Sequence, residues 1–493
     1  MSIVIDQVPA NQLTMLGAVQ LDRIGTSPGP ARNRTYIVGQ KTSSGTATAN
    51  TPVQVSSVQH ARGLFGRGSH LALMVEAYHA NHPTAELWCI PVADNGSGTA
   101  AVGSIQVTAA ATGPGTISLY IAGQLVQVGV APGDGVNTIA AAISAAINDE
   151  LDLPVTATVS TDTVTITCRH KGTLGNEIDT RINYRTGECL PSGVALSITQ
   201  VGAGTAGATD PTLTTANTAL ASAVWRWLVY PYTSDSQVDA LDTIMFSRWD
   251  AMIGLQGAAF SGYDDTVANL TTWSGSRNSP HHVTVGCYAS PTPTWQVGAA
   301  YAGACVRSLE AHASVPLLAR AVAGVLAPDI ASRFTETEIN TLGLDGVATF
   351  RFDSFDQPRI ANAVTHYKTD SLGAADTTLQ FVNAPAQLMV ISDRTKALIA
   401  STCAGKILVD DASLVSPGTP VIDTEIIAAN VRGLYGEMVR DGLVEAPDEF
   451  ADALVVERDG SNANRINILM PPDLANQLNV VGVLLRPYLQ FRG

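Results

Sequence analysis

The sequence predicts an α/β core built on a doubly wound sheet, with an antiparallel β domain inserted into it. An α+β domain follows the core, and an extended arm stands at each end of the chain. Three observations carry this prediction: strand-like and helix-like segments alternate in two separate stretches, a stretch rich in Gly, Ala, Thr and Ser lies between them, and short apolar runs occupy both ends. Alternating strands and helices are typical of a sheet that is covered by helices on both faces.

Changes in residue composition and hydrophobic pattern along the 493 residues divide the chain into six segments. They are the N-terminal arm (1–30), the first part of the core (31–94), the inserted β-rich domain (95–208), the second part of the core (209–370), the α+β domain (371–478) and the C-terminal arm (479–493). Breaker-rich flanks, "ADNGSGTAA" and "GAGTAGATDPTLTT", separate the insert from the core. The small polar residues of the insert suit an outward-facing position better than the centre of an interface.

The first part of the core is predicted to run strand, helix, strand. "TYIVGQ" (35–40) and "AELWCIPV" (85–92) are apolar runs of strand length. Between them, "LFGRGSHLALMVEAYHANHP" (64–83) predicts a helix with apolar residues at helical spacing. These residues are Leu71, Met74, Val75 and Tyr78.

The insert alternates apolar and polar residues in runs such as "GSIQVTA", "GTISLYIAG" and "DTVTITC", which predict antiparallel strands. One helix interrupts them at "NTIAAAISAAINDEL", where Ile139, Ile143 and Ile147 form an apolar stripe. In the second part of the core we expect strands at "WRWLVYPY" and "HHVTVGCYA" and helices at 236–254 and 294–312. The last domain is expected to hold helices around 393–404 and 423–442, strands at "ALVVERD" and "RINILM", and the terminal apolar strand "NQLNVVGVLLRPYLQF".

The composition favours self-association and argues against several partners. Hydrophobic residues make up 45% of the chain and charged residues only 14%, against about a quarter in a typical soluble protein, so subunit contacts are expected to cover uncharged surface. The alternative is a large enzyme with a generous core. The net charge of −15 disfavours nucleic acid, and neither a membrane span nor a signal peptide is predicted. Six scattered cysteines, without a CxxC pair, indicate reduced and mostly buried thiols.

Two Gly-containing stretches are candidates for phosphate sites, and both lack essential features. In "VGQKTSSG" (38–45) Gln40 stands where a P-loop needs glycine before Lys41, and no helix can follow. In "GRGS" the spacing of a dinucleotide-binding loop is missing, so Gly66 and Gly68 are predicted to serve a sharp turn into the helix. No cofactor is therefore expected.

Candidate catalytic and metal-binding residues are equally weak. There is no GxSxG, and Ser69 and His70 would point about 100° apart on a helix. His281 and His282 open a strand and are expected to lie one buried and one exposed. His79 and His82 lack a third metal ligand in the sequence around them. The acidic pairs Asp264–Asp265 and Asp410–Asp411 are expected in solvated loops. The sequence thus predicts no catalytic, cofactor-binding or metal-binding residue.

The order of several strings over nearly the whole chain resembles the contractile tail sheath proteins of bacteriophages, particularly those of Mu-like phages. The strings are "IDQVP" (5–9), "YIVGQKTSSGTATANTPVQVSS" running into "LFGRGSHLALMVEAYHANHPTAELWCIPV", "NAPAQLMVISDRTKALIAS" (383–401), "FADALVVERDGSNANRINILMPPDLANQLNVV" (450–481) and the terminal "LQF". One departure is Leu16–Gly17, where the family often has Pro-Gly.

The resemblance implies a subtilisin-like core without a protease's residues, and therefore no enzyme. It implies hexameric rings that stack helically around a tail tube and contract to drive that tube through the host envelope. The implied partners are further copies of the chain, the tube protein, and baseplate and tail terminator proteins, without direct nucleic acid contact or membrane insertion. The implied location is the virion tail, after assembly in the host cytoplasm.

The resemblance also implies that the arms exchange strands between subunits. Ile3 and Ile5 at one end, and Val481, Val483 and Leu485 at the other, show the period of two that a strand uses. Apolar strands at chain ends need a neighbour's sheet edge, and these five residues are therefore the predicted inter-subunit contacts. Three alternatives stay open: a sheath from a tailocin or related injection device, a subtilisin-fold hydrolase, and a carbohydrate-binding module at 95–208, where Tyr120 is the only aromatic residue up to 183.

Overall fold

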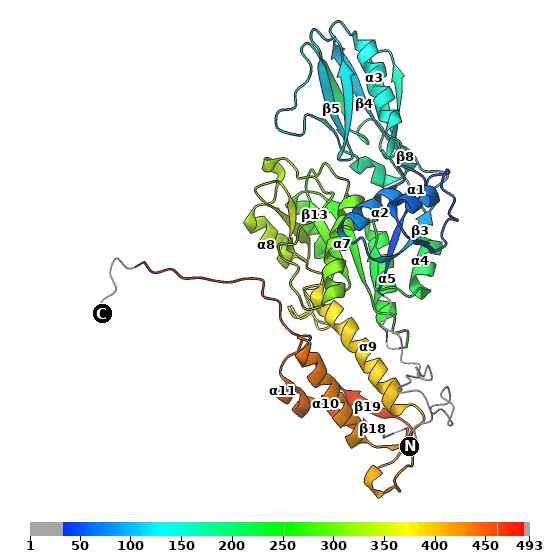
Figure 1. Cartoon of the computed structure of the whole chain (residues 1–493), viewed down its shortest axis with the longest axis vertical. Coiled ribbons are helices and arrows are strands. Elements are labelled where there is room, and N and C mark those ends of the chain that lie inside the picture. Colours follow the sequence, from blue (N-terminus) through cyan, green and yellow to red (C-terminus); the bar gives the residue numbers. More distant parts are fainter. Residues whose placement is uncertain (1–32, 251, 461, 488–493) are drawn as a thin grey trace, which may run out of the picture. The chain divides into compact units, whose positions relative to one another are not determined.

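The computed structural model describes residues 33–250, 252–460 and 462–487, coloured along the sequence in Figure 1. The chain forms two compact units, and each is described by itself. The larger unit comprises residues 33–390, 439–445 and the tail from 473, and the smaller unit comprises 391–438 and 446–472. The predicted N-terminal arm, with Ile3 and Ile5, lies outside the described residues.

An eight-stranded sheet organises the larger unit, in the order β15-β14-β13-β12-β11-β1-β3-β2. The six strands from β14 to β3 are parallel, and β15 and β2 flank them antiparallel. The strands are β1 (Arg34–Gln40), β2 (Val53–Val55), β3 (Glu86–Val92), β11 (Trp227–Val229), β12 (Ala258–Asp264), β13 (His282–Cys287), β14 (Ala348–Phe352) and β15 (Pro358–Asn362). Their apolar residues are buried on both faces, as parallel sheets require.

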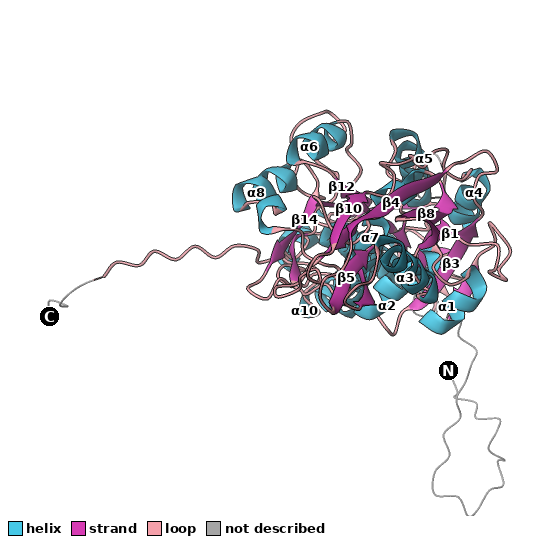
Figure 2. Cartoon of the chain, turned by 90° about the horizontal axis from the view of Figure 1, so that it is seen from above, coloured by secondary structure: helices cyan, strands magenta, loops and turns pink. Residues whose placement is uncertain are grey.

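Helices cover both faces of this sheet, and the predicted α/β character is confirmed. Figure 2 shows α4, α5, α6 and α8 on one side of the strands and α1, α2 and α7 on the other. The helices are α1 (Val58–Phe65), α2 (His70–Asn81), α4 (Thr214–Ser222), α5 (Asp235–Trp249), α6 (Val267–Gly275), α7 (Thr294–Ala311), α8 (Glu336–Leu344) and the short η2 (Ile330–Ser332). Helix α7 lies almost against the backbone of β12, since a Cβ on Gly262 would stand 2.3 Å from the carbonyl oxygen of Thr294.

Between β3 and α4 the chain forms two antiparallel sheets, β10-β4-β8-β7 and β6-β5-β9, around a core of their own. The elements are β4 (Ala100–Ala109), β5 (Gly115–Ile121), β6 (Gln124–Val130), α3 (Val136–Asp149), β7 (Val155–Ser160), β8 (Thr163–Lys171), η1 (Thr173–Glu177), β9 (Thr180–Ile182) and β10 (Ala195–Thr199). The predicted isoleucine stripe of α3 is buried in that core.

The last segment is mixed α and β, as predicted, but its first helix starts earlier. The elements are α9 (Asn383–Cys403), β16 (Ile407–Leu408), η3 (Ala412–Leu414), β17 (Val421–Ile422), α10 (Thr424–Arg440), α11 (Pro447–Ala453), β18 (Val455–Arg458) and β19 (Ile466–Leu469). Helix α9 begins at Asn383 rather than near residue 393. Its first turn includes Pro385, which a helix tolerates there because the N–H groups of the first turn have no partner in the helix.

The described part of the C-terminal tail forms no strand within the chain, since residues 475–487 pair with none of the described strands. The predicted pairing with a neighbouring subunit stays a prediction. All six cysteines are free, and Cys89, Cys168, Cys287 and Cys305 are buried, in agreement with the prediction of mostly buried thiols. In the described ranges no helix combines the length and the apolarity needed to cross a membrane.

Candidate assembly site

The predicted contact residues of the C-terminal arm are strongly exposed. Val481, Val483 and Leu485 have 70%, 75% and 84% of their surfaces accessible. The neighbouring apolar side chains of the arm are exposed as well, so a continuous apolar segment faces solvent along the described tail. Exposed apolar segments of this kind are typical of surfaces that bind another chain.

The arm leaves from a root that is hydrogen-bonded to the segment after α10. The N–H of Ala475 donates to the carbonyl oxygen of Leu443 at 3.1 Å, and the N–H of Glu445 donates to the carbonyl oxygen of Asp473 at 2.8 Å. The N–H of Asn476 donates to the Glu445 carboxylate at 3.0 Å. Residues 473–476 are therefore held by the body of the larger unit, and the exposed arm begins after them.

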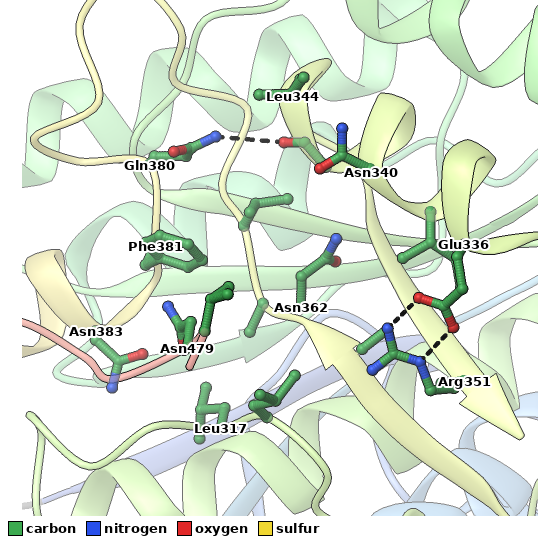
Figure 3. A pocket seen from close by; sticks show the side chains of 17 residues that line it. Leu317, Glu336, Asn340, Leu344, Arg351, Asn362, Gln380, Phe381, Asn383 and Asn479 are labelled. Carbon is green, nitrogen blue, oxygen red and sulfur yellow. Dashed lines mark hydrogen bonds and ion pairs between the residues drawn. The ribbon is translucent and has the colours of Figure 1, made fainter. Parts of the chain in front are cut away.

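Beyond this root, the tail lies at the rim of a groove of about 440 Å³, shown in Figure 3. Helix α8, the outermost strand β15 and Phe381 line it, and Asn479 and Val480 of the tail contribute to its wall. Its charged lining residues, Glu336 and Arg351, form an ion pair with each other, with Nε at 2.7 Å from Oε1. The groove therefore offers a largely neutral surface for a peptide and no set of convergent titratable groups.

The smaller unit contains a second candidate surface, the hairpin of β18 and β19. The two strands pair antiparallel, with Val455 opposite Leu469, and form a sheet of two strands within the described chain. These two side chains are 44% and 61% exposed. A two-stranded hairpin is marginally stable alone, and within the described residues neither of its outer edges pairs with a further strand.

A Ser–His–Asp contact, which the sequence did not reveal, lies inside the main sheet. Ser261 on β12 places its Oγ 2.8 Å from Nε2 of His282 on β13, and Nδ1 of His282 lies 3.8 Å from a carboxylate oxygen of Asp242 on α5. Burial lowers the pKa of His282 to about 3 and raises the pKa of Asp242 to about 6.

The direction of the hydrogen bonds argues against catalysis by this set. The Ser261 hydroxyl donates to the carbonyl oxygen of Tyr230 at 2.7 Å, so its contact with His282 uses a proton from Nε2 of the imidazole. A general base needs the opposite arrangement, in which the imidazole accepts the serine proton. Ser261 is 1% exposed and lies within its strand, so no substrate reaches it in this conformation.

The expectation of one buried and one exposed histidine at the start of β13 is wrong. Both His281 and His282 are buried, because Trp249 at the end of α5 stacks on the His281 ring at a centroid distance of 4.3 Å. His366 lies beside His282 at 4.7 Å between ring centroids and contacts Thr284 through Nε2 at 3.0 Å. These histidines form a neutral cluster in the core, since burial lowers the pKa of each.

The expectation of solvated acidic pairs is correct only in part. Asp410 is 90% exposed at its side chain and pairs with Arg458 at 2.6 Å. Asp264 instead ends β12 half-buried and accepts the N–H groups of Ala289 and Ser290 at 2.9 and 3.0 Å. Desolvation raises the pKa of Asp264 despite these hydrogen bonds. Its role in this structure is to hold the loop that follows β13.

The "GRGS" stretch forms the predicted turn into α2. Gly66 and Gly68 have φ values of +86° and +70°, and a Cβ on Gly68 would stand 2.2 Å from the carbonyl oxygen of Leu153. Ser69 caps the helix by accepting the N–H of Ala72 at 3.2 Å. His70 is buried and stacks on Trp295 at 4.5 Å. Conformation and packing account for each of these residues.

The carboxyl edge of the parallel sheet, where doubly wound proteins bind ligands, is covered by the β-rich insert. Gln40 at the end of β1 is fully buried and donates through Nε2 to Asp94 at 2.8 Å and to the carbonyl oxygen of Lys171 at 2.7 Å. Asp94 also contacts Nδ1 of His170 at 2.8 Å. The chain's own residues thus fill the place that a cofactor would occupy beside β1.

A second part of the insert closes the same edge beside β12. The hydroxyl of Thr294, at the start of α7, donates to the Glu177 carboxylate of η1. Burial raises the pKa of Glu177 to about 8. A polar hollow of about 310 Å³ remains here, lined in part by Glu177, Asp179 and Arg181, and Asp179 and Arg181 pair with each other at 2.5 Å.

The remaining candidates are structural in this chain. His82 contacts Glu310 through Nε2 at 2.9 Å, and no group of three ligands suited to a metal ion occurs within the described ranges. Tyr120 is 2% exposed and donates to Glu188 at 2.8 Å. Tyr120 therefore offers no exposed ring for stacking on a sugar.

Comparisons with known proteins agree with this picture. Residues 96–197 match the family model of the phage tail sheath protein beta-sandwich domain. Over 482 residues the chain is 32% identical to the Mu-like prophage FluMu tail sheath protein of Haemophilus influenzae, covering 97% of this chain and 98% of that protein.

Two solved structures share the fold at low sequence identity. The sheath tail protein of Desulfitobacterium hafniense has a TM-score of 0.50 and 12% identity, covering 94% of this chain and 97% of its own. A chain of the anti-feeding prophage baseplate, solved by cryo-electron microscopy, has a TM-score of 0.51 and 10% identity, covering 97% of this chain and all of its own (100%).

These findings define a structural protein of a phage tail. The near-full-length identity then gives the family: the chain belongs to the phage tail sheath proteins, as the order of its sequence strings predicted.

Proposed function

We propose that the chain is the subunit of a contractile sheath, whose hexameric rings stack helically around a rigid tail tube. The sheath shortens when a baseplate triggers it and drives the tube through the host envelope. Its partners are further copies of itself, the tube protein, and baseplate and tail terminator proteins, and its place is the virion tail, after assembly in the host cytoplasm. The likeness to a tail sheath protein over 97% of the chain carries this proposal.

Strand exchange through the arms is the proposed means of assembly. The exposed arm bearing Val481, Val483 and Leu485 follows an anchored root, and the hairpin of β18 and β19 has two edges that no other described strand occupies. Main-chain hydrogen bonds from a neighbour's arm would extend that hairpin, with alternate side chains covering its apolar face. Ile3 and Ile5 are proposed to act in the same way from the other end.

The proposal includes no enzymatic step and no cofactor. The carboxyl edge of the sheet is closed by Gln40, Asp94 and Glu177, which supports a structural role. The six parallel strands with helices on both faces support a subtilisin-like core at 31–94 and 209–370. The insert at 95–208 is proposed to face away from the tube, because its small polar residues suit a solvent-facing position. The last domain is proposed to span 371–478.

Negative-stain electron microscopy of the purified full chain tests the proposal, because sheath subunits polymerise into long hollow cylinders. The chain ending at residue 479 is the matched sample, and we expect it to stay monomeric while keeping the melting temperature of the full chain. A full chain that remains monomeric at high concentration and high salt would count against the sheath. Cylinders from the shortened chain would count against arm exchange but not against the sheath function.

A hydrolase is the one alternative that a specific contact favours, namely the 2.8 Å approach of Ser261 to His282. A fluorophosphonate probe, which labels activated serines, distinguishes the two functions. We expect no labelling of Ser261 in the native chain. Labelling that disappears with Ser261→Ala would establish a hydrolytic centre.

A further inference from the structure

Two amide side chains stand one turn apart at the start of α9. Asn383 and Gln387 are 2% and 1% exposed, and their spacing of four residues places them on the same side of the helix. The Nε2 group of Gln387 lies within hydrogen-bonding distance of three acceptors from separate parts of the larger unit. They are Ser314 Oγ at 2.8 Å, the Leu443 carbonyl oxygen at 3.2 Å and the Ala475 carbonyl oxygen at 2.9 Å.

The acceptors fix the orientation of this amide. Two of them are carbonyl oxygens, which only accept, so the amino end of Gln387 must face them. Its Oε1 is buried without a partner among the described residues. An unsatisfied buried oxygen is costly, so the side chain keeps this position for the contacts that its amino group makes.

Asn383 lies on the same helix and makes comparable hydrogen bonds to the segment after α7, but it is hydrogen-bonded to no described residue of the tail. Its Nδ2 group donates to the carbonyl oxygens of Ala313 and Val315 at 2.7 and 3.0 Å. Asn383 and Gln387 therefore both fasten α9 to the segment after α7. Gln387 alone of the two also holds the root of the C-terminal arm.

We infer that Gln387 is a positioning residue for assembly, which clamps the arm root so that the free tether begins after Asn476. This inference rests on the proposed exchange of C-terminal arms. Residues 477–480 span at most roughly 14 Å when extended, which limits where the strand from Val481 onward can reach a neighbour. Release of 473–476 would double this tether and lower the effective concentration of the arm at its acceptor about threefold.

Hydrogen exchange on the full chain at subunit concentrations tests the clamp directly. In Gln387→Ala we expect the amides of Ala475 and Asn476 to exchange about fivefold faster than in the unaltered chain, the factor that a lost hydrogen bond of about 1 kcal/mol gives. Asn383→Ala is the control: it removes a buried amide from the same helix and should leave these two amides unchanged. Equal exchange in Gln387→Ala and the unaltered chain would overturn the inference.

Assembly supplies the second readout. We expect Gln387→Ala to need about threefold more protein to form cylinders, the factor by which the effective concentration of the arm falls. Val444 and Leu474 form a β-bridge at the root, so Val444→Cys and Leu474→Cys can be joined by a disulfide that holds the root in place. Added to Gln387→Ala, this disulfide should restore the protein concentration at which the unaltered chain forms cylinders. It also keeps the test usable if Gln387→Ala folds poorly.

The outcomes separate this inference from the function on which it rests. Faster exchange with unchanged assembly would show that the root position does not matter and would overturn the inference. Cylinders from the chain ending at residue 479 would instead overturn arm exchange, whatever Gln387→Ala does.

Discussion

At the residue scale, the glycines of the opening turn and the buried histidines show how far the sequence could be interpreted. Gly66 and Gly68 were predictable, because a Gly-x-Gly-Ser string before a helix needs the backbone freedom that only glycine has. The contact of Ser261 with His282 was not, because it depends on the register of β12 and β13, in which Ala259 stands opposite His282. Register between distant strands is set by the fold and is absent from local sequence.

Gly68→Ala is expected to destabilise the chain by at least about 2 kcal/mol, since a Cβ there meets the Leu153 carbonyl oxygen at 2.2 Å and the φ of +70° is strained for alanine. Gly63→Ala is the matched control. Gly63 lies inside α1, and a Cβ added there would have no other atom within 4 Å, so alanine should stabilise by roughly 0.5–1 kcal/mol. Urea unfolding measures both. Equal effects would contradict the steric argument.

The buried histidines predict a loss of stability in acid. His282 has a folded pKa of about 3, below the value near 6.5 of an unfolded histidine, so the unfolded chain binds more protons between these values and stability falls as the pH drops below about 6.5. His281 and His366 act with the same sign. For each histidine that stays neutral, the loss between pH 6.5 and 5 is about 2 kcal/mol.

The groups that face this cluster modify the slope. Asp242 has a raised pKa of about 6, so its protonation stabilises the folded chain as the pH falls and offsets part of the loss. The positive charges of Arg277 and Lys368 further lower the pKa of His366. Asp242→Asn should therefore steepen the acid loss, and His366→Gln should reduce it. Urea unfolding at pH 7 and 5 measures both, and parallel profiles for all three chains would show that the cluster does not control acid stability.

At the element scale, long periodic segments were predictable and short ones were not. Helices α2, α5 and α7 and strands β1 and β3 carry apolar patterns of sufficient length. Strand β12 reads "AAFSGYD", whose Ala, Ser and Gly have little strand propensity, and it forms because parallel neighbours on both sides bury it. The hydrogen bonds that join the insert to the end of β1 could not be predicted either, because their partners Gln40, Asp94 and His170 lie far apart in the sequence.

The hydrogen bonds between the insert and the end of β1 should depend on Asp94. Its carboxylate accepts from Gln40, His170 and the N–H of Lys171, so Asp94→Ala leaves buried donors unpaired and is expected to cost about 3 kcal/mol. Asp152→Ala is the control, since it removes the partly exposed ion pairs that one carboxylate makes with Arg67 and Arg62 in the same region and should cost at most about 2 kcal/mol. Thermal unfolding compares them. A smaller loss for Asp94→Ala than for Asp152→Ala would contradict this dependence on Asp94.

At the scale of the whole molecule, the chain combines a core whose sheet edge is covered by its own insert with an exposed apolar tail. The carboxyl edge of the sheet is filled by its own insert, while the described tail presents apolar residues that nothing in the described chain covers. The sequence predicted an apolar C-terminal arm, and its residues Val481, Val483 and Leu485 are exposed in the described chain. It could not show that the arm root is fixed at 473–476, because the partners of these residues lie at 443–445.

Val483→Pro tests whether the arm acts as a strand. In the monomer Val483 is 75% exposed and unpaired within the described chain, so proline should leave the melting temperature unchanged. In an exchanged strand, proline removes a ladder N–H from the centre of the segment, and we expect cylinders to be lost. Val483→Thr keeps the N–H and the β-branched shape and should still assemble. Size-exclusion chromatography with electron microscopy decides the matter, and cylinders of normal length from Val483→Pro would show that the arm binds by its side chains and not by strand pairing.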